Sequence, residues 1–403
     1  MLTRLESLLI LTFLVSFGAS SVQAQTSAAA FQQVLQQKAS FAEVDFAALQ
    51  HDQAVVRTAP VSDKREIAVT GLINVRAGAE AFLHSYLDSM TQKNNAAIVE
   101  IGSFAKEPAL ADLQNLTIEN QDIEDLKECV VGDCRVKLSA QMIERFRREI
   151  NWQAPDYQIK AANLFKQMLV DYVREYRTRG ESALIEYNDK IDEISLAAEQ
   201  RAITAEPSYI NDVLTDKNSG LRLIEDAIVW SKINFGLKPV IAINHITVYQ
   251  RQSDAGPQVL VSAKQIYATH YFNASQSLTA FVSVPGNGNY LIYENRSSAD
   301  GLEGPFSKLK RRAVEKKVLA ALRNILEQSK IAVDGPALTA TGLEFSSHTP
   351  YDWRYRLFGG IRPLLWLLML SALIALLFLG RRRVDSEAAV RRSKALKPES
   401  AKS

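Results

Sequence analysis

The chain has 403 residues, with 47 Lys and Arg against 45 Asp and Glu, and 47% of its residues are hydrophobic. These values are typical of globular proteins and exclude a disordered chain, a collagen and a low-complexity polymer. The near-neutral charge balance also argues against a nucleic-acid binder, whose domain would carry clustered Lys and Arg. The length suits two or three domains.

The first 24 residues have the pattern of a secretory signal peptide. A start containing Arg4 is followed by a mostly apolar run from Leu8 to Phe17, and small and polar residues lead to Ala24. This apolar core is shorter than the roughly 20 residues that span a bilayer. We therefore expect cleavage after Ala24, with an uncleaved anchor as the alternative, and leave residues 1–24 out of the fold.

Residues 361–380 predict a single transmembrane helix. The chain is apolar from Leu364 to Gly380 apart from Ser371, and three arginines follow at 381–383. The tail 381–403 carries eight basic and three acidic residues, which predicts that it lies in the cytoplasm. A buried core helix, the alternative, would not explain the three arginines. We expect a single-pass protein of the cytoplasmic (inner) membrane with its large N-terminal part exported.

The only two cysteines, Cys129 and Cys134, lie five residues apart with a Gly-Asp turn between them. In an exported domain such a pair predicts a disulfide, which we interpret as a structural staple, with a labile regulatory disulfide as the alternative. A Cys-x-x-Cys redox motif is absent. No His lies between His84 and His245, so a zinc site is not predicted, and we predict no metal.

Helical and strand patterns alternate through the first part of the exported chain. Residues 25–65 form a poorly defined segment with a helical pattern around 31–49. Strands are expected at 66–75 and 97–102, with an amphipathic helix after Gly78 between them. A large helical insertion is expected at about 139–235, capped first by Ser139. Its helices are expected at 142–150, 158–179 (closed by Gly180), 195–203, 208–214 and 221–234.

From Pro239 the hydrophobic period changes to two, which predicts an antiparallel meander. Strands are expected at 240–250, 258–272, 277–284 and 290–295, with a hairpin turn over 285–289. A long helix follows at 306–330, with Phe306, Leu309, Ala313, Val318, Leu322 and Ile325 as its apolar stripe. Residues 331–360 are expected to tether the 66–330 domain to the membrane. The predicted fold class is therefore α+β: an antiparallel sheet with a long C-terminal helix.

This order of elements resembles the helix-grip fold of START and SRPBCC-like lipid-binding proteins, over residues 66–102 and 239–330. The resemblance implies a curved sheet around the last helix, often with an apolar cavity between them, although the large insertion departs from it and would fill or cap that cavity. Three further segments, Asp125 to Leu138, Phe235 to Pro239 and Ala268 to Phe272, are similar to a family of exported, membrane-anchored bacterial proteins without an established function.

Two histidines are the candidate ligand-binding or catalytic residues. His245 and His270 each fall within a predicted strand, and paired strands would bring them to one cavity with Tyr249 or Tyr267. Glu294 is the nearest third ligand for a metal. The alternative is that both histidines are hydrogen-bonded structural residues. The nucleophile, zinc-protease, Walker and dinucleotide motifs are absent, so we predict no cofactor.

The start of the long helix is basic. Lys308, Lys310, Arg311 and Arg312 would touch anionic headgroups if this helix lies at the membrane. The alternative is a solvated helix face.

The leading hypothesis is an envelope protein that binds a lipid or another hydrophobic molecule. The alternative is a non-enzymatic interaction or structural module that docks an envelope protein, and a third option is an enzyme using His245 and His270. The expected partners are therefore the membrane, through residues 361–380, and a hydrophobic ligand or an envelope protein. No nucleic acid is expected as a partner.

Overall fold

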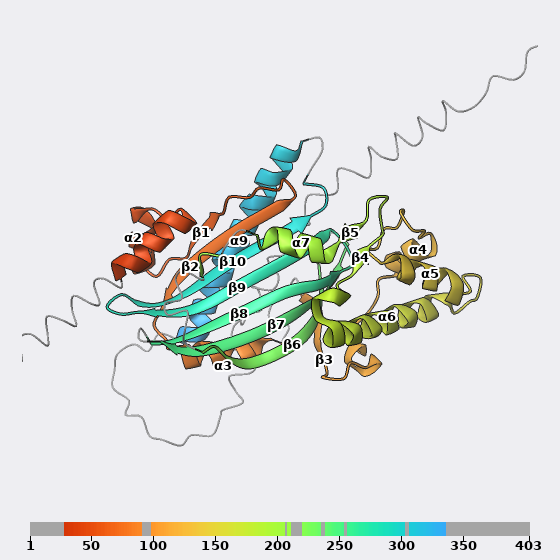
Figure 1. The fold of residues 1–403 in the computed structure, drawn as a ribbon, viewed down its shortest axis with the longest axis horizontal. Helices are drawn as coiled ribbons and strands as arrows, with labels where there is room; N and C mark the ends of the chain where they lie inside the picture. Colours follow the sequence, from red (N-terminus) through yellow and green to blue (C-terminus); the bar gives the residue numbers. More distant parts are fainter. Residues whose placement is uncertain are drawn as a thin grey trace, which may run out of the picture.

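The computed structural model describes residues 28–90, 98–205, 208–210, 220–234, 238–253, 256–302 and 306–335. The fold is α+β, built on an eight-stranded sheet in the order β1-β2-β10-β9-β8-β7-β6-β3 (Figure 1). Every neighbouring pair of these strands is antiparallel. The strands are β1 (Val55–Thr58), β2 (Glu66–Val75), β3 (Ile98–Phe104), β6 (Arg222–Ile233), β7 (Val240–Ser253), β8 (Gly256–Ala268), β9 (Phe272–Val284) and β10 (Gly288–Ala299).

Two helices, α3 (Ala79–Ser89) and α9 (Ser307–Asp334), cover one face of the sheet, the far face in Figure 1. The apolar stripe of α9 packs on β2. A Cβ atom placed on Gly71 of β2 would lie only 2.6 Å from Leu326 Cδ1 and 3.0 Å from Leu322 Cδ2. The missing side chain at Gly71 therefore lets the long helix lie directly on the strand.

The opposite face is covered at both ends. A helix over residues 28–39 and α2 (Glu43–Gln50) pack at one end. The other end carries an insertion between β3 and β6 with a hydrophobic core of its own. Its elements are η1 (Leu110–Leu113), α4 (Asn120–Lys127), α5 (Ala140–Glu149), α6 (Tyr157–Arg179), η2 (Gly180–Ala183), the hairpin β4 (Glu186–Tyr187) and β5 (Ile194–Ser195), and α7 (Leu196–Ile203).

The insertion also closes a gap in the sheet. The ladder between β8 and β9 ends at the pair Lys264 and Gln276, and beyond it no register pairs the two strands. Gln200 of α7 donates its Nε2 to the carbonyl of Gln265 at 2.8 Å and to that of Ser275 at 3.1 Å. A side chain of the insertion thus satisfies backbone acceptors that the ladder leaves open.

Most predicted elements are confirmed. The strand at 66–75, the meander from 240 and the long last helix are all present. Ser139 caps α5 by accepting a hydrogen bond from the amide of Met142, as expected of an N-cap. Gly180, with a positive φ of 60°, follows the last residue of α6. The helix expected at 208–214 falls largely outside the described residues.

The helix predicted at 221–234 is wrong, because these residues form strand β6. Residues 228–233 are buried on both faces of the sheet, so they lack the alternation that marks a half-exposed strand. Trp230 points toward the insertion and donates its Nε1 to the carbonyl of Asp112, while Val229 packs in the core under α3 and α9. The insertion is therefore shorter than 139–235 at its C-terminal end, and it contains a small hairpin besides helices.

None of the helices within the described residues is long and apolar enough to cross a membrane. The signal peptide predicted at 1–24, the span at 361–380, the tail at 381–403 and nearly all of the tether lie outside the described residues.

Candidate functional site

A loop stapled by a disulfide, residues 128–134, follows α4 in the first part of the insertion. A disulfide joins Cys129 and Cys134. Within the loop the amide of Val130 donates to the carbonyl of Asp133 at 3.1 Å, and the reverse bond measures 3.0 Å. Gly132 has a φ of 87°, in the left-handed region that glycine enters without strain. The sequence is consistent with this geometry, because its Gly-Asp turn brings the two sulfurs within bonding reach.

The connection between β4 and β5 lies along the stapled loop. The amide of Gly132 donates to the carbonyl of Asn188 at 2.8 Å, and the amide of Cys134 donates to that of Asp189 at 2.9 Å. Ile191, at the turn of this connection, lies 3.8 Å from where a Cβ on Gly132 would stand. The two loops therefore form one hydrogen-bonded unit.

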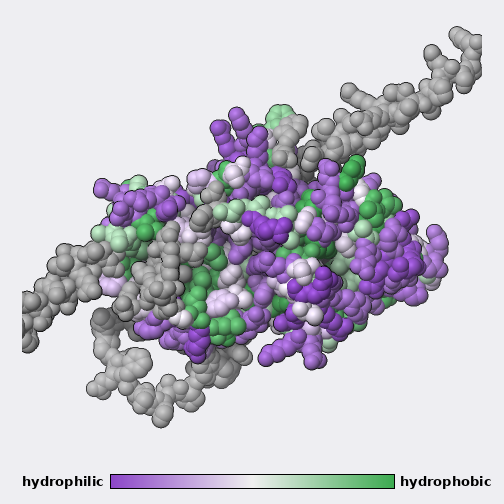
Figure 2. Space-filling model, viewed as in Figure 1, coloured by the Kyte–Doolittle hydropathy of each residue, from purple (hydrophilic) through white to green (hydrophobic). Residues whose placement is uncertain are grey.

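This unit exposes three aliphatic side chains, Val130, Val131 and Ile191, which we call the tip. Ile191 is 94% exposed and Val131 is 47% exposed. Hydrophobic surface is visible in this region, beyond β4 (Figure 2). Four exposed acidic side chains lie within two or three residues of the tip residues in the chain: Glu128, Asp133, Asp192 and Glu193. Two nearby basic groups are ion-paired: Arg135 with Asp125 and, at 3.9 Å, with Glu128, and Lys190 with Asp300.

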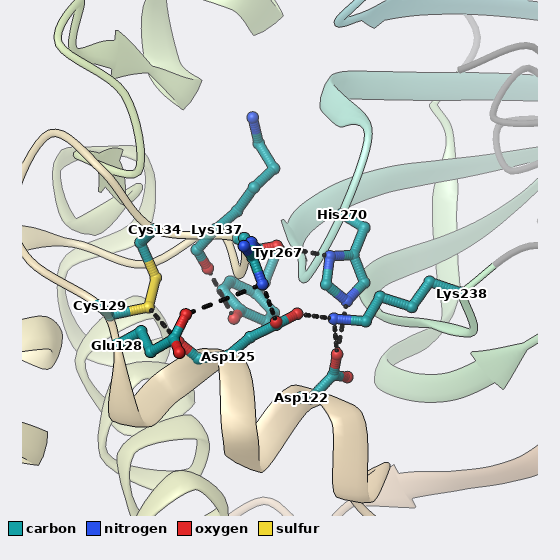
Figure 3. The surroundings of a disulfide bond; sticks show 10 residues. Asp122, Asp125, Glu128, Cys129, Cys134, Lys137, Lys238, Tyr267 and His270 are labelled. Carbon is teal, nitrogen blue, oxygen red and sulfur yellow. Dashed lines mark hydrogen bonds and ion pairs between the residues drawn. A yellow bond between two sulfur atoms is a disulfide. The ribbon is translucent and has the colours of Figure 1, made fainter. Parts of the chain in front are cut away.

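Lys238 fixes the base of the stapled loop to the sheet (Figure 3). It lies just before β7, and its Nζ is 2.6 Å from Asp122 Oδ1 and also pairs with Asp125. Both carboxylates belong to α4 and are buried. Arg135, just after the disulfide, donates to Asp125 Oδ1 at 3.0 Å. Lys238 thus pairs with both buried carboxylates, and Arg135 pairs with one of them, Asp125.

His270 completes this cluster. Its Nε2 lies 3.2 Å from Asp122 Oδ1, and its Nδ1 lies 3.1 Å from the carbonyl oxygen of Arg135. Because a carbonyl oxygen only accepts, Nδ1 carries a proton in that bond. Burial would raise the pKa of Asp122, but hydrogen bonds and charge from His270 and Lys238 outweigh it, and the pKa lies below its ordinary value. The pKa of Asp125 is lowered against burial in the same way, by Lys238 and Arg135.

A second buried charge cluster lies beside the first. Lys137 Nζ donates to Asn273 Oδ1 at 2.9 Å and to Asp300 Oδ2 at 3.1 Å. Burial would raise the pKa of Asp300, but Lys137 and Lys190 lower it to about 2. Asp189, whose Oδ1 is 3.9 Å from Lys137 Nζ, has its pKa raised by burial.

The three segments that carry the sequence resemblance to exported bacterial proteins meet at these clusters. The first supplies Asp125 and Arg135, the second Lys238, and the third His270. The amide of Lys137 also donates to the carbonyl of Thr269, at 2.8 Å. This convergence could not be read from the sequence, because the first segment lies about a hundred residues before the second, and a strand that was predicted as a helix lies between them.

The predicted ligand-binding residues do not form one site. His270 lies in the turn after β8 and not within a strand, because β8 ends at Ala268 and β9 begins at Phe272. His245 of β7 instead contacts Tyr176 Oη at 2.9 Å and Asp226 Oδ1 at 3.3 Å. The two histidines therefore have separate partners, in keeping with the structural alternative.

The tyrosines named with these histidines also lie apart. Buried Tyr267 donates its hydroxyl to the carbonyl of Lys137 at 2.9 Å, whereas Tyr249 is half-buried in β7. Glu294 contacts Ser208 and Arg296 rather than a histidine. Among the described residues, no group of three or more His, Cys, Asp or Glu is placed to hold a metal ion.

The basic start of α9 differs from its prediction in two ways. Arg311 is not a free surface charge, because it pairs with Glu315 and donates to the carbonyls of Lys64 and Glu66. Phe306 and Leu309 were expected in the buried stripe but are exposed, at 78% and 67%. The helix begins beyond the edge of the sheet, so its first turn has no core to face.

The arrangement around the disulfide suits a structural anchor better than proton transfer. The carboxylates of Asp122, Asp125 and Asp300 are bound to Lys, Arg or His groups, and these contacts hold two loops against the sheet. What the anchor presents to solvent is the aliphatic tip.

Comparison with known protein families, with characterised proteins and with solved structures finds no significant match for this chain.

Proposed function

We propose that the chain is a single-pass protein of the cytoplasmic membrane whose exported domain is a non-enzymatic docking module, and that it binds another exported protein through the tip. The observation that supports this most is the exposure of Ile191 and Val131 on a unit fixed by a disulfide, backbone hydrogen bonds and two charge clusters. Rigid loops lose little conformational entropy on binding, and exposed aliphatic groups gain free energy when they are covered.

The surroundings of the tip indicate the chemistry of the partner. The exposed residues Glu128, Asp133, Asp192 and Glu193 are close neighbours of the aliphatic residues in the chain. An apolar depression with Lys or Arg on its rim would complement this surface in shape and charge. An anionic bilayer would be repelled by it. We therefore propose a protein partner with a basic rim.

Site-directed photo-crosslinking tests this proposal in the intact chain. A benzoylphenylalanine at Val131 or at Ile191 should capture one and the same exported protein. The same probe at Ile159, an exposed aliphatic position in α6, is the matched control and should not capture it. An added Val130→Asp substitution should abolish capture at Ile191. Equal capture at Ile159, or none at the tip, would count against docking here.

A hydrophobic-ligand carrier is the second candidate. The sheet order β2-β10-β9-β8-β7-β6-β3 with one long last helix supports the helix-grip comparison. Against it, Leu322 and Leu326 lie directly on Gly71, which leaves no space for a ligand at that contact. Native mass spectrometry of the intact chain released from a membrane distinguishes the two functions. A bound lipid-sized mass that survives delipidation would favour the carrier. The mass of the chain without a ligand would favour the docking module. The separate surroundings of His245 and His270 give an enzyme the least support.

A further inference from the structure

The first half of α9 exposes apolar and basic side chains together. Phe306 and Leu309 are among the most exposed large apolar residues of the described chain. Basic side chains continue the same outward face. At 100° per residue, Leu309, Arg312, Lys316 and Arg323 fall on one stripe, opposite the buried Val314 and Val318. Hydrophilic side chains project from this end of α9, at the top of Figure 2, with hydrophobic surface beside them.

Apart from Arg311, the basic groups of this stripe and its flanks form no ion pair with any residue that the structure describes. Between residues 307 and 323 the only acidic residue is Glu315, and Arg311 already pairs with it. Within the described residues, none of the other basic side chains here forms an ion pair. They are Lys308, Lys310, Arg312, Lys316, Lys317 and Arg323. The surface is therefore strongly positive around two exposed apolar groups.

We infer that this surface, which we call the α9 face, rests on the anionic headgroups of the membrane, with Phe306 and Leu309 inserted at the level of the headgroups. Basic side chains around exposed Phe and Leu are typical of interfacial membrane contacts, because headgroup attraction and apolar burial act together. A protein partner fits less well, since six long basic side chains would have to be ordered and neutralised. The α9 face is opposite in charge to the tip, so the two surfaces select different partners.

The chain itself keeps the α9 face near a bilayer. This step rests on the proposed membrane anchor, because only 25 residues, 336–360, separate the described end of α9 from the predicted span. Fully extended, they reach at most about 80 Å. The face therefore samples a small volume next to the membrane, in which a weak interfacial affinity suffices. Contact there would set the orientation of the exported domain and direct the tip.

Depth-dependent quenching tests the inference with the full chain in nanodiscs. The native cysteines are joined in a disulfide, so a Leu309→Cys variant accepts a single NBD fluorophore. In nanodiscs with anionic phosphatidylglycerol and brominated acyl chains, we expect the emission to be blue-shifted and quenched. In neutral phosphatidylcholine nanodiscs, and in an Arg312→Glu/Lys316→Glu background, quenching should fall to the level of an Ile159→Cys control.

Each other outcome overturns the inference. An unquenched probe in the anionic nanodisc would show that the α9 face does not touch the bilayer. Equal quenching in neutral and anionic lipid would show that headgroup charge is not recognised. Incorporation of the chain into the nanodisc reports separately on the predicted span, so only incorporated chains are compared. Circular dichroism of the Arg312→Glu/Lys316→Glu variant confirms that it is folded.

Discussion

Lys238 Nζ lies 2.6 Å from Asp122 Oδ1, and this contact joins the insertion to the start of strand β7. Lys238 lies just before strand β7 and Asp122 belongs to the insertion. Both side chains are largely buried, so the pair persists only because each charge is matched. This contact is one of those that set the position of the stapled loop, and with it the tip.

Lys238→Met should destabilise the domain by about 3 kcal/mol. The substitution leaves Asp122 and Asp125 buried with one positive partner fewer, and an unmatched buried charge is costly. Urea unfolding followed by circular dichroism measures the loss in free energy of unfolding. Adding Asp122→Asn to this variant should restore part of it, since one of the two carboxylates that lost Lys238 as a partner is then neutral.

Lys264→Met is the matched control for that experiment. Lys264 also forms an ion pair, but its partner Glu181 is 73% exposed. Solvent-exposed pairs contribute less than about 1 kcal/mol. Equal losses for Lys238→Met and Lys264→Met would mean that the cluster beneath the disulfide is not buried in solution.

The pH dependence of stability should carry the signature of Asp300. Its pKa is about 2 in the folded protein against an ordinary value of 3.8, so the unfolded chain binds the proton first as the pH falls. The stabilisation is complete above about pH 5 and is lost between about pH 4 and pH 2. The shift corresponds to about 2 kcal/mol. Asp189, with its raised pKa, acts in the opposite direction.

Comparison with Asp300→Asn isolates this contribution. The variant should be less stable than the parent at pH 7, and the difference should shrink as the pH falls from 5 to 2. Asp192→Asn, an exposed substitution on the adjacent connection, should follow the parent throughout. A constant difference between the parent and Asp300→Asn at all pH values would contradict the lowered pKa.

Local patterns predicted the elements that expose one face to solvent or end in a clear cap. The alternation of β7 and the Ser139 cap of α5 are examples. The hydrophobic pattern wrongly predicted a helix at β6. Val229 and Trp230 are both buried there, because the two faces of the strand are covered. A continuous buried run has no period that separates strand from helix. Its content of Ile, Val and Trp was the one available signal.

The candidate site was only partly predictable. The spacing of Cys129 and Cys134 predicted a disulfide between them, and the structure contains this disulfide. The meeting of Lys238 with Asp122 did not, because it depends on how the insertion folds back on the sheet. The exposure of Ile191 was also missed, since an isolated aliphatic residue between Lys and Asp gives no indication of its burial. Tertiary contacts decide all of these.

Removing the disulfide should cost about 2 kcal/mol, as the chain-entropy relation gives for so short a loop. A Cys129→Ala/Cys134→Ala variant avoids leaving a buried polar group, because Cys129 is buried. Most of the effect should be local: cleavage by a protease near Val131 should accelerate, while the sheet stays folded. Reduction of the parent should reproduce both effects. A variant that is as stable and as protease-resistant as the parent would show that the backbone hydrogen bonds alone hold the loop.

Gly71→Ala should destabilise the domain by about 2 kcal/mol through overpacking, because the new Cβ would stand 2.6 Å from Leu326 Cδ1. Leu326→Ala should cost about 3 kcal/mol by leaving a cavity under α9. The two substitutions share one contact, since the methyl group added at position 71 occupies part of that cavity. Their combination should therefore be less destabilising than the sum, by about 1 kcal/mol or more. A double-mutant cycle in urea measures this coupling. Strict additivity would mean that α9 does not lie on β2. It would then favour the carrier hypothesis, in which a ligand fills a space between helix and sheet.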